Sequence, residues 1–334
     1  MSDKKRSFKK SIIGGGLSII ILAIAGFLFF NQQYVKDQVT VWSYQPSSQI
    51  KAIEDRVSFT GKGQFYFYAT QPEVDGSEKF NLDCPRQEVG NPILGCYSAG
   101  RIYVYDVTND QLDGIEEVTA AHEMLHSVWE RHSTSEQARI GALLRVEFQK
   151  LTDDPDFAER MGYYQRTEPG EFENELHSII GTEVKTLSPE LETYYAQYFE
   201  DRQKVVKLHA KYDTVFNTLR TQSESLYSEL KNLGSSIESR TAQYNNDVKQ
   251  LSADIESFNT RANNGSFSSI NQFNRERSVL LTRSNQTDSM RALISDDIEM
   301  YNLKYADYQK ISSQIEALNK SIDSIKDLQP SPSV

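Results

Sequence analysis

The sequence predicts an α+β domain that follows an apolar N-terminal helix and precedes a long antiparallel helical hairpin. Three observations favour this fold class. Residues 12–30 carry no charge, strand-prone and helical segments are mixed between residues 35 and 200, and apolar residues recur at steps of three and four from Tyr212 onward. A chain of 334 residues is long enough for one compact domain and an extended arm.

The N-terminal 30 residues have the composition of a membrane anchor. Residues 12–30 are a run of 19 apolar or small residues, and a helix of that length spans about 28 Å, close to the thickness of the bilayer hydrocarbon. Five lysine and arginine residues lie among the first ten residues, which predicts that residues 1–11 are a cytoplasmic basic tail and that the chain after the anchor is extracytoplasmic. A cleaved signal peptide is the alternative, since residues 23–25 resemble a cleavage site. We favour an uncleaved, single-pass anchor in the cell membrane because cleavage would leave an apolar N-terminus exposed.

The charge of the chain beyond its first ten residues argues against a nucleic-acid partner. That part of the sequence holds 31 basic and 46 acidic residues, a net charge of −15. A surface with such an excess of negative charge repels nucleic acid and anionic lipid headgroups. We therefore expect no nucleic-acid partner, and we expect contact with the membrane through residues 12–30.

The two cysteines, Cys84 and Cys96, are predicted to form a disulfide. Both follow the predicted anchor and would lie in an oxidising exterior, where a bond closing a loop of about 13 residues stabilises a fold by roughly 3 kcal/mol. The segment between them contains two prolines and two glycines, which favours a loop. Zinc ligation by the cysteines is the alternative, but a Cys-x-x-Cys spacing is absent.

The elements expected between residues 35 and 200 are short strands and helices. Runs rich in aromatic and β-branched residues indicate strands, whereas apolar residues three and four apart, together with capping residues, indicate helices. In chain order we expect a helix over 47–57, strands over 64–70 and 101–107, a helix that ends near His132, a helix from the capping box Ser133–Glu136 to about Leu151, a helix over 171–185 and a long helix from Pro189.

Residues 201–328 are predicted to form an antiparallel coiled-coil hairpin. One seam of apolar residues at heptad spacing begins at Tyr212, a second includes Ile294, and the Asn/Gly-rich segment 263–266 separates them. Each arm would be roughly 80–90 Å long if straight. The many Ser, Asn and Gln residues predict a soft coiled coil, and residues 329–334 are expected to be a disordered tail.

The most informative motif is the run His122-Glu123-Met124-Leu125-His126. On a helix, residues four apart lie one above the other, so His122 and His126 can present two imidazole nitrogens to one metal ion. Glu123 lies about 100° further round the helix, where a carboxylate can take a proton from a zinc-bound water. The spacing therefore predicts a Zn²⁺ site, with Glu123 as the catalytic base.

This run resembles the HExxH motif of zincin metallopeptidases, and the chain is most similar to the gluzincin, or thermolysin-like, branch. There, an Asn-Glu-x-x-Ser segment supplies a glutamate as the third zinc ligand, and residues 174–178 match it with Glu175 in the ligand position. The aspartate that normally follows the serine is Ile179 here. That departure leaves the orientation of a zinc-binding histidine unexplained.

Two alternatives to Glu175 as the third ligand stay open. Glu173 fits another pattern of the family, Glu-x-x-x-Asp/Asn, with His177 in place of the last residue. His132 has the spacing of the third histidine of metzincins, although Trp129 replaces the glycine that turns the chain back toward the metal in that pattern. A regular helix would carry His132 about 9 Å beyond His126, on another face.

The resemblance implies a membrane-anchored extracytoplasmic zinc endopeptidase, with a zincin-like domain at residues 35–200 and a small sheet edge beside the active helix. Glu123 would deprotonate a zinc-activated water and pass the proton to the leaving amine of a protein or peptide substrate. The alternative prediction is a non-catalytic membrane-anchored scaffold whose coiled coil binds a protein of the cell envelope. The hairpin favours this alternative, since hydrolysis needs no long helical arm.

Overall fold

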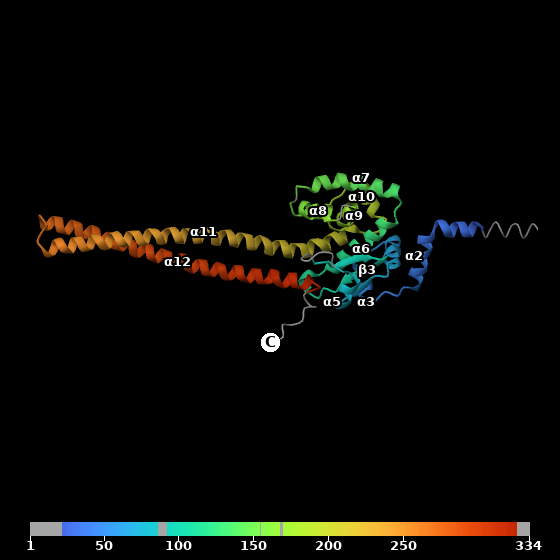
Figure 1. The fold of residues 1–334 in the computed structure, drawn as a ribbon, viewed down its shortest axis with the longest axis horizontal. Helices are drawn as coiled ribbons and strands as arrows, with labels where there is room; N and C mark the ends of the chain where they lie inside the picture. Colours follow the sequence, from blue (N-terminus) through green and yellow to red (C-terminus); the bar gives the residue numbers. More distant parts are fainter. Residues whose placement is uncertain (1–21, 86–91, 154, 168–169, 326–334) are drawn as a thin grey trace, which may run out of the picture. The chain divides into compact units, whose positions relative to one another are not determined.

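The computed structural model describes residues 22–85, 92–153, 155–167 and 170–325, and its contacts divide the chain into two units. The first unit comprises the described residues up to Val215 and those from Asn319 onward. The hairpin unit comprises Phe216–Leu318. Both are mostly helical, and the described part of the first unit contains one small mixed sheet, so the fold has less strand than the predicted α+β class (Figure 1).

The sheet has three short strands in the order β1-β3-β2. The strands are β1 (Glu73–Asp75), β2 (Gly95–Ser98) and β3 (Arg101–Tyr105). β1 pairs with β3 in parallel and β2 pairs with it antiparallel, with Cys96 opposite Tyr103. The strand predicted over 101–107 is therefore the central one, whose Ile102 and Val104 are fully buried, and β2 is an edge strand.

The helices of the first unit pack against this sheet and against one another. They are α2 (Gln32–Ser43), α3 (Ser48–Val57), α4 (Gly61–Ala69), α5 (Ser77–Asp83), α6 (Ile115–Arg131), α7 (Thr134–Leu151), α8 (Pro155–Thr167), α9 (Phe172–Glu183) and α10 (Pro189–Tyr195). The predicted helices over 47–57 and 171–185 are confirmed as α3 and α9. The predicted boundary near His132 is confirmed too, because the Ser133 side chain accepts the N–H of Glu136 and begins α7.

The prediction of a strand over 64–70 is wrong, because these residues form most of α4. The helix begins where the Thr60 side chain accepts the N–H of Gly63 at 3.1 Å. Phe67 is fully buried in the core, and Gly63 lies against the backbone carbonyl of Tyr198, where a Cβ would collide. These tertiary contacts outweigh the strand propensity of the aromatic residues.

The long helix predicted from Pro189 is also interrupted, since α10 ends at Tyr195 and the next helix begins at Arg202. The backbone between them pairs with the segment before α4, where Thr60 donates to the carbonyl of Tyr198 at 2.9 Å. Tyr195 and Tyr198 are fully buried. Burying large aromatic side chains contributes on the order of 2 kcal/mol each, which favours the break over a continuous helix.

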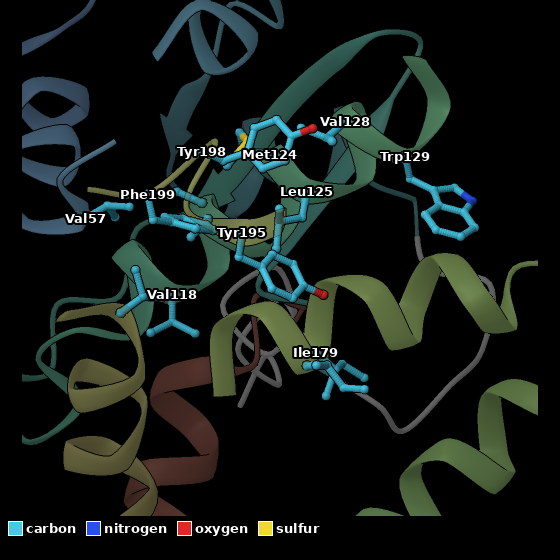
Figure 2. Close-up of a cluster of buried hydrophobic side chains, with 14 of the residues drawn as sticks. Val57, Val118, Met124, Leu125, Val128, Trp129, Ile179, Tyr195, Tyr198 and Phe199 are labelled. Carbon is cyan, nitrogen blue, oxygen red and sulfur yellow. The ribbon is translucent and has the colours of Figure 1, made fainter. Parts of the chain in front are cut away.

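Most residues of α6 are buried, and many of them belong to the hydrophobic core, part of which is shown in Figure 2. Met124 and Leu125 of α6 are fully buried, and Ile179 of α9 and Tyr195 belong to the same cluster. Gly181 of α9 lies so close to α6 that a Cβ there would come within 2.5 Å of Leu125 Cδ1. The tight packing of α9 on α6 sets which side chains the two helices present to each other.

Cys84 and Cys96 form a disulfide with a Cα–Cα distance of 6.0 Å. The bond joins the residue after α5 to the edge strand β2. Phe80 of α5 and Tyr105 of β3 pack beside it in a small apolar cluster of their own. The covalent link thus holds α5 against the sheet and excludes both cysteines as metal ligands.

The hairpin consists of α11 (Arg202–Asn263) and α12 (Ile270–Ile322), as the heptad pattern predicts. Within the hairpin unit, Arg240 pairs with Asp297 and Arg283 with Asp254, each at 2.6 Å. These pairs run in opposite order along the two arms, as required for antiparallel helices. Gly265, with φ of 71°, makes the left-handed turn between them.

The predicted membrane anchor lies partly outside the described residues. Residues 22–30 are helical, whereas residues 12–21, the basic tail 1–11 and the tail 329–334 are not described. Among the helices of the described segments, none combines the length and the apolarity needed to cross a membrane.

Candidate metal centre

Three side chains from α6 and α9 converge on one point. The Nε2 atoms of His122 and His126 are 3.0 Å apart. The carboxylate of Glu175 lies 3.6 Å from His122 Nε2 and 3.5 Å from His126 Nε2. All three side chains are mostly buried, and among the described residues they are the one His/Cys/Asp/Glu group whose atoms are close enough to hold a metal ion.

The donor atoms fit a tetrahedral zinc ion. Zinc–ligand bonds of about 2.0–2.1 Å at tetrahedral angles place two donors about 3.3 Å apart. The two imidazole nitrogens are 3.0 Å apart, His122 Nε2 is 3.6 Å from Glu175 Oε2, and His126 Nε2 is 3.5 Å from Glu175 Oε1, so each imidazole has a carboxylate oxygen within a few tenths of an ångström of that distance. Glu175 Oε2 is buried and has no hydrogen-bond partner. Burial raises the pKa of Glu175, but the two histidines lower it to a net value below the ordinary one, so the carboxylate is charged. Two imidazoles and one carboxylate form a donor set that leaves a fourth position for water or substrate.

Asn174 fixes the orientation of His126. Its Oδ1 accepts a hydrogen bond from His126 Nδ1 at 2.9 Å, and its own amide nitrogen donates to Glu171 at 2.9 Å. Because the amide oxygen can only accept, Nδ1 carries the proton and Nε2 presents its lone pair to Glu175 and His122. Asn174 therefore takes the orienting role that the sequence left unexplained at Ile179.

We expect Asn174→Ala to weaken zinc binding about 10–100-fold, the usual cost of losing a partner of a zinc-binding histidine. Competition with a chromophoric chelator measures the affinity. Asn174→Asp keeps an acceptor and should restore most of it, and Asn245→Ala, at an exposed position of α11, is the control. Unchanged affinity in Asn174→Ala would show that the hydrogen bond does not orient a ligand.

Glu123 lies beside this group and is almost fully buried. Its pKa is raised to about 7, chiefly by burial; the charge of Glu175 also raises the pKa, whereas His126 and the backbone N–H of Tyr97 lower it. A Cβ on Gly95 would come within 3.1 Å of the Glu123 side chain and 2.5 Å of Thr119 Cγ2. The edge strand β2 thus lies directly against the general-base candidate, a contact for which the sequence carries no signal.

The free edge of β2 faces the same group. The N–H of Tyr105 on β3 donates to the carbonyl of Leu94 at 2.8 Å, and alternate residues of β2 therefore pair with β3. The intervening Tyr97 directs its N–H away from β3, toward Glu123. Within the described part of the chain no strand pairs with this edge.

The structure does not bring the other two ligand candidates to this point. Glu173 pairs instead with Arg145 of α7. His132 follows the last residue of α6, and its Nε2 is 2.7 Å from the hydroxyl of Tyr194. His177 is fully buried on the other side of α9 from Glu175, and its Nε2 is 2.8 Å from the same hydroxyl.

Comparison with known proteins finds no matching family model, no similar curated protein and no similar solved structure. The chemistry of the site is therefore the main guide to function.

Proposed function

We propose that the protein is a zinc-dependent endopeptidase of the zincin type, most like the gluzincins, anchored in the cell membrane with its site outside. His122, His126 and Glu175 would hold the zinc ion, and Glu123 would act as the general base. The observation that carries the proposal is the convergence of three mostly buried side chains whose donor atoms lie within 4.8 Å of one another. One of these donors is a carboxylate with an oxygen that makes no hydrogen bond, and a second carboxylate, that of buried Glu123, lies beside the group.

The residues around the site have separate roles in peptide hydrolysis. A zinc ion bound there would supply a Lewis acid that polarises a carbonyl and lowers the pKa of water. Glu123, with a pKa raised by burial, is suited to accept a proton from the attacking water and to return it to the leaving amine. Asn174 keeps His126 in the tautomer that leaves Nε2 free.

The edge strand supports a peptide as the substrate. An extended peptide can add to the open edge of β2 through main-chain hydrogen bonds, and Gly95 and Tyr97 lie on that edge next to Glu123. The absence of a side chain on Gly95 lets β2 pack directly against Thr119 and Glu123. This arrangement favours a polypeptide over a non-peptide polymer.

We expect metal removal to abolish the activity. Full-length protein in membranes should cleave an unstructured polypeptide, lose the activity in 1,10-phenanthroline and regain it with Zn²⁺ but not with Ca²⁺. The activity should sediment with the membrane fraction, as expected of an anchored protein. Cleavage that is indifferent to the chelator, or protein that takes up no zinc on reconstitution, would overturn the proposal.

A second function, binding of a cell-envelope protein, is proposed for the hairpin unit. Val279, Leu293 and Met300 of α12 are 57%, 54% and 49% exposed and lie at multiples of seven residues, so they form one apolar stripe. The stripe is offset by one residue from the seam that includes Ile294 and Tyr301 and joins the two arms. The intervening position of this series is the polar Gln286, but exposed apolar side chains that share a helix face outside the seam are typical of a surface for another helix.

A photocrosslinker at Leu293 should therefore give one defined adduct in cells, and a crosslinker at exposed Ser295, about 200° further round the helix, should give none. The Leu293→Ser variant should lose the partner in crosslinked pull-downs but keep peptide cleavage. Equal adducts at both positions would rule out the stripe as the binding surface.

A further inference from the structure

Helix α2 has its polar face turned into the protein. Asp37 is 3% exposed, and its two carboxylate oxygens accept hydrogen bonds from the guanidinium of Arg131 at 2.8 and 2.9 Å. Gln33 donates a further hydrogen bond to Asp37 at 2.8 Å. A buried carboxylate with two-point recognition by an arginine is held firmly in place, so the rotation of α2 about its axis is determined.

The opposite face of α2 is apolar and exposed. Val35, Val39 and Trp42 are spaced by four and three residues and share this face. Val35 is partly buried, whereas Val39 is 56% exposed and Trp42 is 77% exposed. A tryptophan that shows three quarters of its surface beside an exposed valine marks a contact surface.

The chain just before α2 indicates what covers this face. In the sequence, residues 12–30 carry no charge, and Phe27, Phe29 and Phe30, at the end of that run, are 56%, 68% and 84% exposed. α2 begins two residues later, at Gln32. An apolar environment that buries these phenylalanines would therefore lie close to the exposed face of α2, because only Asn31 separates Phe30 from the helix.

We propose that α2 lies in the interface of a lipid bilayer, with Val35, Val39 and Trp42 at the boundary between headgroups and acyl chains. Tryptophan is enriched at this depth because its ring is apolar and its indole N–H can donate to polar groups. Lys36, exposed next to the stripe, can extend its ammonium group to the water. With a net charge of −15 beyond residue 10, the protein is held there by apolar burial and by the anchor rather than by attraction to anionic lipid.

The buried ion pair gives this contact a structural consequence. Arg131 is the last residue of α6, five residues after His126, and it also donates to the hydroxyl of Tyr97 on β2 at 3.2 Å. The helix that touches the membrane is thereby joined directly to the helix that carries the two histidines. The inference depends on a membrane anchor at residues 12–30 but not on zinc or hydrolysis.

Tryptophan fluorescence tests the proposal, because the chain has two tryptophans and Trp129 is 9% exposed. The full chain is reconstituted in phosphatidylcholine vesicles that contain lipids brominated near the headgroup or near the chain end. The difference between the wild type and Trp42→Phe isolates the signal of Trp42. We expect strong quenching of this signal by the shallow bromines, weaker quenching by the deep ones, and protection from iodide in the water.

Val39→Asp should reverse this pattern, making Trp42 accessible to iodide, because it places a charge in the apolar stripe. Val146→Asp is the control, since Val146 of α7 is 57% exposed, as Val39 is. Iodide quenching without bromine quenching in the wild type would overturn the proposal by placing the face in water. Trp42 could also be protected from both quenchers and lose this protection when the protein is diluted with lipid. That result would overturn the proposal, because it would mean that a second copy of the chain covers this face of α2.

Discussion

Replacing Glu175 by glutamine is expected to remove zinc from the protein, whereas Glu173→Gln should leave about one zinc ion per chain. The carboxylate of Glu175 is 3.5 and 3.6 Å from the two imidazole nitrogens, and an amide supplies neither the charge nor an equivalent oxygen. Glu173 pairs with Arg145 instead. The loss of zinc affinity in Glu175→Gln should be larger than the factor of about 10–100 that is typical when a residue hydrogen-bonded to a metal ligand is replaced. Elemental analysis and chelator competition measure both variants.

Further outcomes show whether only the third ligand is misassigned or whether zinc binds elsewhere in the protein. Zinc loss in Glu173→Gln but not in Glu175→Gln would mean that α9 is rotated relative to its position in the structure. His132→Ala should retain zinc, since its imidazole bonds to Tyr194. If all three variants kept zinc and His126→Ala also did, the group on α6 and α9 would not be the metal site.

Glu123→Gln is expected to keep zinc and to lower kcat/KM by about 10²–10⁴, the usual contribution of a general acid–base group. Glutamine has nearly the same shape, but it cannot accept a proton from water. The measurement is the hydrolysis of a fluorogenic peptide by zinc-loaded protein, and Glu136→Gln, on α7, is the control. A Glu123→Gln enzyme with wild-type activity would contradict the role of base.

The pH dependence of kcat/KM for the wild-type enzyme should follow the ionisation of the Glu123 carboxylate. Burial raises the pKa of Glu123 to about 7, and the positive charge of a bound cation lowers the pKa of a neighbouring carboxyl. The base is the ionised form, so kcat/KM should rise with pH along an acidic limb whose midpoint lies below 7. Glu123→Gln should lose this limb.

Much of the site could be predicted from the sequence because two of its proposed ligands, His122 and His126, lie on the same helix. His122 and His126 share a helix face through their spacing alone, and their Nε2 atoms lie 3.0 Å apart in the structure. Asn174 shows the limit of such reasoning. It stands next to Glu175 in the sequence, but its contact with His126 spans 48 residues, and nothing local distinguishes it from other asparagines.

Local signals were misleading where tertiary packing opposed them. The aromatic run 64–70 has strand propensity, but buried Phe67 and the close approach of Tyr198 to Gly63 favour a helix there. The helix from Pro189 has a good cap, but it ends early because Tyr195 and the residues after it enter the core. In both cases the free energy of core burial is larger than the propensity of a few residues.

The sequence by itself determined the features set by the spacing of residues along one chain segment. These are the HExxH helix, the antiparallel hairpin, the uncharged N-terminal run and the pair of cysteines. The tertiary structure alone decided that Glu175 rather than Glu173 meets the histidines, that β2 lies against Glu123, and that α2 turns Trp42 outward. Each of these depends on how one element is rotated against another. That rotation is set by close packing between residues far apart in the chain, such as Gly181 against Leu125 and Asp37 against Arg131.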